Sequence, residues 1–252
     1  MADQDTTGQV VSSLEAHVQA LYDALERAQV GLEQALAADE VDVEQRTSEE
    51  LTEYLRGAFR PLAAQLLSGQ SSGHIAGTGA LVDAGPAASR QLSMVWWVRR
   101  NEVVSEKRHN LNPASDAFYD FRVAPWFSTP QRTGRPALTG PYIDAWGLDD
   151  LTITAAVPLT VKGEVVGVVA LDVAIPQFVA DLSQELQRLD VDAAVVNAEQ
   201  RIVASTAPEL TTGLPLTSRA QAAATQSPAT ASYPLCGQGW ALVLLAPEGV
   251  NN

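Results

Sequence analysis

Residues 151–173 read LTITAAVPLTVKGEVVGVVALDV, and this stretch carries the clearest structural pattern in the chain. Two runs rich in valine, threonine and leucine, Leu151–Val161 and Glu164–Ile175, flank the dipeptide Lys162-Gly163, which favours a tight turn. Short runs of this composition between turn residues predict strands. The stretch therefore predicts a hairpin of two long antiparallel strands. One carboxylate, Asp172, lies inside the apolar run, where burial is costly unless the group is paired.

Further segments before this hairpin have the same strand-like composition. They are His74–Val82, Gln91–Arg99, Glu102–Arg108 and Leu138–Asp144. Together the segments predict an antiparallel meander with helices on one face. The segment Pro113–Arg135 interrupts the pattern with prolines and a glycine, so we expect it to cross over the sheet. Long ordered excursions of this kind tend to carry function.

The first part of the chain has a helical pattern. Apolar residues over 9–37 repeat at alternating spacings of three and four: Val11, Leu14, Val18, Leu21, Leu25, Ala28, Leu32 and Ala35. Two interpretations are open. Either this row of apolar residues, here called the seam, packs against the protein's own sheet, or it forms a homodimer through residues 11–35. A second helix is predicted near Thr47, which forms a capping box with Glu50.

The last part of the chain predicts a helix followed by a small second sheet. The helix covers Pro176–Leu189, and the strands cover Asp192–Asn197, Gln200–Ser205, Thr230–Leu235 and Trp240–Ala246. The fold class is therefore α+β, with a long N-terminal helix, a first antiparallel sheet lobe and a reduced second sheet lobe. The expected domains are 1–70 (helices), 71–190 (ligand-binding lobe) and 191–252 (second lobe).

Composition excludes several classes of function. The net charge of −14 disfavours nucleic acid as a partner. One cysteine, Cys236, and three scattered histidines predict no metal site and no disulfide, and no catalytic or phosphate-binding motif indicates an enzyme or a cofactor. The acidic start of the chain is unlike a signal peptide. We expect the chain in the cytoplasm if it is a complete gene product, and outside the cytoplasm if it is the sensor part of a larger protein.

Four blocks occur in an order typical of one family. They are YDFRVAPWF (119–127), GPYID (140–144), LTITAAVPL (151–159) and GEVVGVVALDV (163–173). They resemble the YDPRxRPWY, PYxD, TxSxPV and GxxxGVxxxDI blocks of Cache sensory domains, whose first lobe is PAS-like. The segments AAVVNAEQRIVAS (193–205) and GQGWALV (237–243) are similar to the second lobe of double Cache domains. The resemblance implies a module that senses small ligands and passes a signal to a partner.

The resemblance to the amino-acid-binding subgroup implies specific site residues. They are Tyr119, Trp126, Phe127 and Tyr142 as aromatic lining and Asp172 as the anchor of the ligand's ammonium group. The arginine that holds the ligand carboxylate in that subgroup is replaced by Ala124.

The chemistry of the remaining residues favours an organic cation. A bidentate arginine suits a carboxylate, and alanine cannot replace it. A carboxylate among aromatic rings suits an amine, a polyamine or a quaternary ammonium ion. Asp144, with Asp149 and Asp150, could hold a second ammonium group. Alternatively, Arg122 fills the gap and the ligand is an amino acid or carboxylate, or the chain is an interaction module without a ligand. Each aromatic residue could also be an ordinary core residue.

Overall fold

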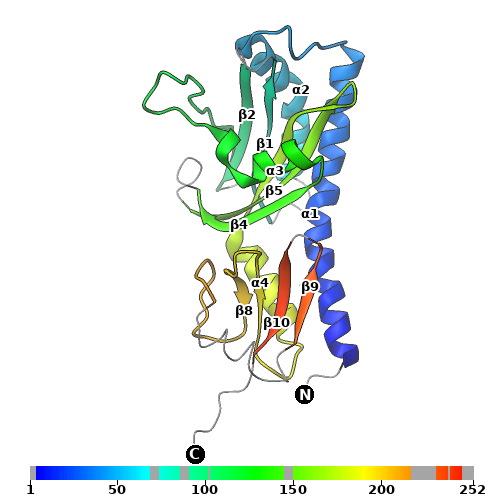
Figure 1. Cartoon of the computed structure of the whole chain (residues 1–252), viewed down its shortest axis with the longest axis vertical. Coiled ribbons are helices and arrows are strands. Elements are labelled where there is room, and N and C mark those ends of the chain that lie inside the picture. Colours follow the sequence, from blue (N-terminus) through cyan, green and yellow to red (C-terminus); the bar gives the residue numbers. More distant parts are fainter. Residues whose placement is uncertain are drawn as a thin grey trace, which may run out of the picture. The chain divides into compact units, whose positions relative to one another are not determined.

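The computed structural model describes residues 4–68, 74–85, 91–101, 103–144, 150–216, 231–237 and 239–245 (Figure 1). The chain forms two compact units. The larger unit contains Leu21–Thr139 and Ile153–Ala174, and the smaller unit contains Met1–Ala20, Gly140–Thr152 and Ile175–Asn252. The helix α1 (Gln4–Ala38) contributes residues to both units.

Most of the predicted seam of α1 is buried within the single chain. Leu14, Leu25 and Leu32 are no more than 1% exposed, and Val18, Leu21 and Ala28 are buried as well. The other two seam positions, Val11 and Ala35, are half-buried. This burial agrees with the interpretation that the seam packs against the protein's own fold, and it leaves little of the seam for a second chain.

The helix α2 (Ser48–Ser68) begins with the predicted capping box. Glu50 Oε2 accepts from the backbone N–H of Thr47 at 2.9 Å, and Thr47 Oγ1 accepts from the N–H of Glu50 at 3.2 Å. This reciprocal pair satisfies two N–H groups that the first turn of a helix otherwise leaves without partners.

A six-stranded antiparallel sheet dominates the larger unit. Its strands are β1 (Ile75–Ala84), β2 (Gln91–Arg100), β3 (Val103–Glu106), β4 (Ala137–Ile143), β5 (Leu151–Val161) and β6 (Glu164–Val173). The predicted hairpin of β5 and β6 is confirmed. The prediction of one continuous meander is wrong, because the order is β3-β2-β1-β6-β5-β4. Two three-stranded meanders join where β1 pairs with β6, so the chain re-enters the sheet at the opposite edge after its excursion.

The two faces of this sheet carry different helices. On β2, Trp97 packs against Phe59 of α2, with ring centroids 5.9 Å apart. Trp96 points to the opposite face, because side chains alternate along a strand, and its ring centroid lies 6.5 Å from that of Trp126. Trp126 belongs to α3 (Pro125–Thr133), within the predicted excursion. The helix α2 and the excursion therefore cover opposite faces of the sheet.

The smaller unit contains the predicted second sheet. After α4 (Ile175–Leu186) come β7 (Ala193–Val196), β8 (Ile202–Ser205), β9 (Ser232–Leu235) and β10 (Trp240–Leu244), in the order β8-β7-β10-β9. One cluster of its core consists of small and medium apolar residues: Ala194, Val196, Ile202, Ala207, Leu216, Val243 and Leu245.

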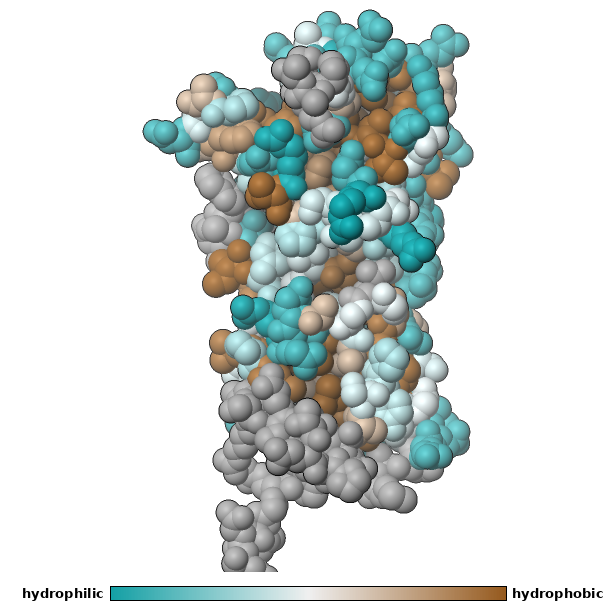
Figure 2. Space-filling model, in the orientation of Figure 1, coloured by the Kyte–Doolittle hydropathy of each residue, from teal (hydrophilic) through white to brown (hydrophobic). Residues whose placement is uncertain are grey.

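Exposed apolar side chains are dispersed along the chain. The most exposed are Val123 at 78% and Ile143 at 71%. The visible face in Figure 2 likewise shows hydrophobic residues interspersed with hydrophilic ones. Single exposed apolar residues are normal on protein surfaces, so the candidate site is better sought among buried polar groups. Within the described ranges, every helix is too short or too polar to cross a membrane.

Candidate functional site

A buried carboxylate lies in the middle of the six-stranded sheet. Asp172, near the end of β6, is only 5% exposed. Its cross-strand neighbours are Thr154 on β5 and Gly77 on β1. Thr154 Oγ1 donates a hydrogen bond to Asp172 Oδ1 at 2.7 Å. The burial cost of a carboxylate in this apolar strand is thus partly offset by a hydroxyl donor on the neighbouring strand.

An indole ring covers the sheet next to this carboxylate. The ring of Trp96 lies against Gly77 and Gly79 of β1, so closely that a Cβ at Gly77 would lie 2.9 Å from Trp96 Nε1. Gly77 is the residue directly opposite Asp172. The two glycines therefore leave the space that lets Trp96 lie flat on the face that carries Asp172. The register assigns Trp96, and not its neighbour Trp97, to this face.

The excursion supplies further aromatic rings. The helix α3 begins at Pro125, which suits the first helical position, and it ends before Gly134, at φ 64°. Trp126 and Phe127 are both buried in its first turn. Their rings are perpendicular, with centroids 6.3 Å apart. Through its contact with Trp96, Trp126 lies over the same sheet face as Asp172.

Tyr119 and Phe127 belong to a ring cluster within the excursion. The Tyr119 ring lies 4.9 Å from His109 and 6.4 Å from Phe121, and Phe121 meets Phe127 edge to face at 4.7 Å. Phe127 is 1% exposed and Phe121 is fully buried, so both are core residues of the excursion. Tyr119 is half-buried and forms the more accessible end of the cluster.

Arg122 is held by a neighbouring carboxylate. Its Nε and Nη2 donate to Oδ1 and Oδ2 of Asp120 at 2.7 and 2.8 Å. The side-chain hydrogen bond with Asp120 raises the pKa of Arg122, and the charge of Asp83 adds to this effect. The same pair lowers the pKa of Asp120. Arg122 would have to leave this bidentate pair before it could take the place of the arginine that Ala124 replaces.

Two predicted site residues belong to the smaller unit. Tyr142 is half-buried on β4, between buried Pro141 and exposed Ile143. The backbone N–H of Asp144 donates to the carbonyl of Asp150 at 3.1 Å. Asp149 lies outside the described residues. The roles of Tyr142 and Asp144 in a site with Asp172 stay predictions.

Comparison with known proteins identifies the type of domain. Residues 76–179 match the family model of the first PDC sensor domain of methyl-accepting chemotaxis protein-like receptors. A search of curated proteins finds no match.

Solved structures share the fold over nearly the whole chain. The structure of methyl-accepting chemotaxis protein X has a TM-score of 0.59 at 16% identity, covering 97% of this chain and 96% of its own. The ligand-binding domain of the Pseudomonas aeruginosa PAO1 amino acid chemoreceptor PctC, in complex with GABA, has a TM-score of 0.54 at 18% identity, with 96% of each chain covered. That of the Campylobacter jejuni chemoreceptor Tlp3, in complex with L-norvaline, has a TM-score of 0.57 at 13% identity and covers 94% and 87%.

The match includes the strand and helix residues that build the candidate site. It covers β1, β2, the excursion and the hairpin of β5 and β6. The family and the fold are those of sensor domains, not of enzymes. Residues 76–179 of this chain are therefore similar to sensor domains of the PDC, or Cache, type.

Proposed function

We propose that this chain senses a small organic cation, bound on the sheet face that carries Asp172. The observation that carries the proposal is the burial of Asp172 on the same face as Trp96 and Trp126. A carboxylate contributes a charge-assisted hydrogen bond to an ammonium group. An indole ring adds roughly 0.5–2 kcal/mol by cation–π attraction. Amines, polyamines and quaternary ammonium ions match this combination.

The charge distribution supports a cation over an amino acid. An amino acid needs a receptor for its carboxylate, and Ala124 offers none. The nearby guanidinium of Arg122 is already held by Asp120. GABA, the ligand of PctC, carries both an ammonium and a carboxylate group. By likeness to such receptors, this chain keeps the group that anchors the ammonium and lacks the group that clamps the carboxylate.

Other predicted residues have supporting roles in this proposal. Tyr119 is the hydrogen-bonding partner at the accessible end of the ring cluster, and Phe127 fixes the position of Trp126 from the core. The lobe 71–190 binds the ligand, whereas 1–70 and 191–252 support it.

The proposed route of signal transfer is the helix α1. Because α1 contributes to both compact units, ligand-dependent movement of one unit can be passed along it to a partner. By the family resemblance, the domain senses outside the cytoplasm. Sedimentation with and without ligand tests whether the partner is a second copy, and a monomer under both conditions would contradict a homodimer.

The proposal is tested by thermal unfolding with a panel of amines, polyamines, amino acids and carboxylates. A ligand at about a hundred times its Kd stabilises by roughly 2.7 kcal/mol. In a chain of this size that stabilisation raises Tm by roughly 5–10 °C. Asp172→Asn should abolish the shift. Asp190→Asn is the matched control, since Asp190 is exposed and lies in the smaller unit.

Each outcome of the panel is informative. Shifts with amines alone, lost in Asp172→Asn and kept in Asp190→Asn, support the cation sensor. Shifts with amino acids alone would mean that another group replaces the missing arginine, and the cation preference would be wrong. No shift with any compound favours an interaction module instead.

A further inference from the structure

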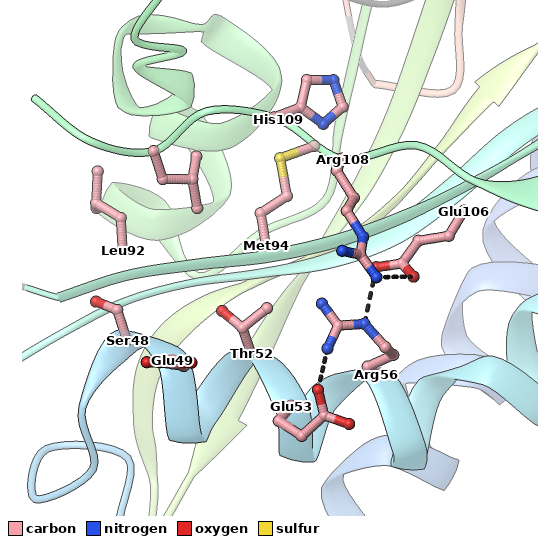
Figure 3. A pocket seen from close by; sticks show the side chains of 11 residues that line it. Ser48, Glu49, Thr52, Glu53, Arg56, Leu92, Met94, Glu106, Arg108 and His109 are labelled. Carbon is pink, nitrogen blue, oxygen red and sulfur yellow. Dashed lines mark hydrogen bonds and ion pairs between the residues drawn. The ribbon is translucent and has the colours of Figure 1, made fainter. Parts of the chain in front are cut away.

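A groove runs along the outer edge of β2 in the larger unit. Its volume is about 490 Å³, and its walls come from the first turns of α2, from β2 and from the segment 106–111 (Figure 3). This volume falls within the range of ligand-binding cavities. The edge of β2 that forms the groove lies away from Asp172, since β1 separates β2 from β6 in the sheet.

The floor of the groove is an open strand edge. β2 has ten residues but its outer neighbour β3 has four, and their register stops at Trp97 opposite Glu106. Beyond it, the backbone N–H of Lys107 donates to the carbonyl of Trp96 at 2.8 Å. Within the described part of the chain, no strand continues this pairing along residues 92–95.

The backbone groups at this edge face the groove. In an antiparallel ladder, the N–H and C=O of alternate residues point to the same neighbour. Because the Trp96 carbonyl points outward to Lys107, those of Met94 and Leu92 point outward too. Both residues line the groove. Unpaired backbone groups along a strand edge are a template for another strand.

An ion-pair network fixes one end of the groove. Arg56 Nε on α2 lies 2.8 Å from Glu106 Oε1 at the end of β3, and Arg56 also pairs with Glu53. Arg108 Nη2 lies 3.8 Å from Glu106 Oε2. Figure 3 shows the guanidinium groups of Arg56 and Arg108 converging beside Glu106. This network links α2 to Glu106, at which β3 ends, and to the nearby Arg108.

We propose that the groove binds an extended, basic peptide segment of a partner protein by strand addition to residues 92–95 of β2. Four residues of a strand span about 13 Å at roughly 3.3 Å per residue. The lining contains three carboxylates, Glu49, Glu53 and Glu106, against the two arginines Arg56 and Arg108. This excess of negative charge favours basic side chains on the partner.

The apolar side of the groove sets the pattern of the partner. Leu92, Met94 and Leu111 line it, opposite the polar face of α2 with Ser48 and Thr52. An added strand presents alternate side chains to opposite sides. The segment therefore alternates apolar with basic residues. A second copy of this chain is a poor partner, because its net charge is −14.

The test uses the whole chain and a blocked heptapeptide of alternating lysine and valine, with binding measured by calorimetry and by backbone amide NMR. The same peptide with N-methyl groups on alternate residues lacks the donors for strand addition. Met94→Pro removes one outward N–H while leaving the β1–β2 ladder intact, a place where a strand tolerates proline. Val104→Pro on β3 is the matched control, because it adds an edge proline outside the groove lining.

The proposal predicts saturable binding with amide shifts centred on residues 92–95. N-methylation and Met94→Pro should each weaken binding at least tenfold, whereas Val104→Pro changes it less than twofold. Glu49→Gln should weaken it a few-fold. Three results would each overturn the proposal. They are the absence of saturable binding, equal binding of the N-methylated peptide, and self-association of the chain in sedimentation. The N-methyl comparison decides the question in wild-type protein even if Met94→Pro fails to fold.

Discussion

Replacing Gly79 by alanine should destabilise the protein through the ring that forms the candidate site. A Cβ at this position would fall well inside 3.0 Å of both the Trp96 ring and the carbonyl of Val95. Neither neighbour is a flexible side-chain end, because one is a packed indole and the other is strand backbone. Overpacking of this kind costs roughly 1–3 kcal/mol. At roughly 2–4 °C per kcal/mol, calorimetric melting should show a fall in Tm of roughly 2–12 °C.

Two other glycines turn this prediction into a graded series. Gly77→Ala should cost less than Gly79→Ala, since its new Cβ would lie 2.9 Å from Trp96 Nε1 and 3.2 Å from the carbonyl of Trp97. Gly57→Ala, inside α2 with nothing within 4 Å, should stabilise by about 1 kcal/mol because alanine is the better helix former. A Gly79→Ala variant as stable as wild type would refute the placement of Trp96 against the glycines, and with it one wall of the site.

Three further predictions concern the site and the smaller unit. Thr154→Val removes the hydroxyl that donates to Asp172. Urea denaturation should show a free energy of unfolding lower by roughly 1–3 kcal/mol. An unchanged value would contradict this hydrogen bond. Ala124→Arg should gain binding of amino acids in calorimetry, and no gain would weaken the likeness to amino-acid receptors. Partial burial, with the charge of Glu15 adding to it, raises the pKa of Cys236 to about 11 from 9.0. Since only the thiolate reacts, alkylation at pH 8 should be roughly a hundredfold slower than in the unfolded chain, and it should accelerate as pH rises towards 11. A rate equal to that of the unfolded chain would contradict the raised pKa.

The sequence predicts the elements of the fold well because their periodicities are strong. The strand Leu151–Val161 is observed with the predicted bounds, and the capping box at Thr47 is observed as a reciprocal hydrogen-bonded pair. The order of the strands could not be predicted in the same way. Local pattern does not say which non-adjacent strands pair, so the union of β1 with β6 depends on long-range packing that periodicity does not encode.

The partner of Asp172 shows why the site was only partly predictable. Counting outward from the Lys162-Gly163 turn in simple register places Asp172 opposite Ile153. A register shift between Leu159 and Thr160 moves it opposite Thr154, which supplies the hydroxyl. A bulge of this kind leaves little trace in a single sequence.

The groove on β2 was missed for a related reason. The composition of 102–108 predicts a strand long enough to cover more of β2, but β3 ends at Glu106. The ion pair of Glu106 with Arg56 of α2 joins residues 50 positions apart. Local sequence does not reveal such a long-range contact, so it does not reveal where the strand ends.

The most direct test of the proposed function is a calorimetric comparison of n-butylamine with GABA on the wild-type chain and on Asp172→Asn. The two ligands share an ammonium group on a short alkyl chain and differ in the terminal carboxylate. A site with a buried carboxylate and no arginine clamp predicts that butylamine binds at least tenfold more tightly than GABA, and that Asp172→Asn abolishes its binding. Tighter binding of GABA, or butylamine binding that survives Asp172→Asn, would contradict a cation sensor anchored by Asp172.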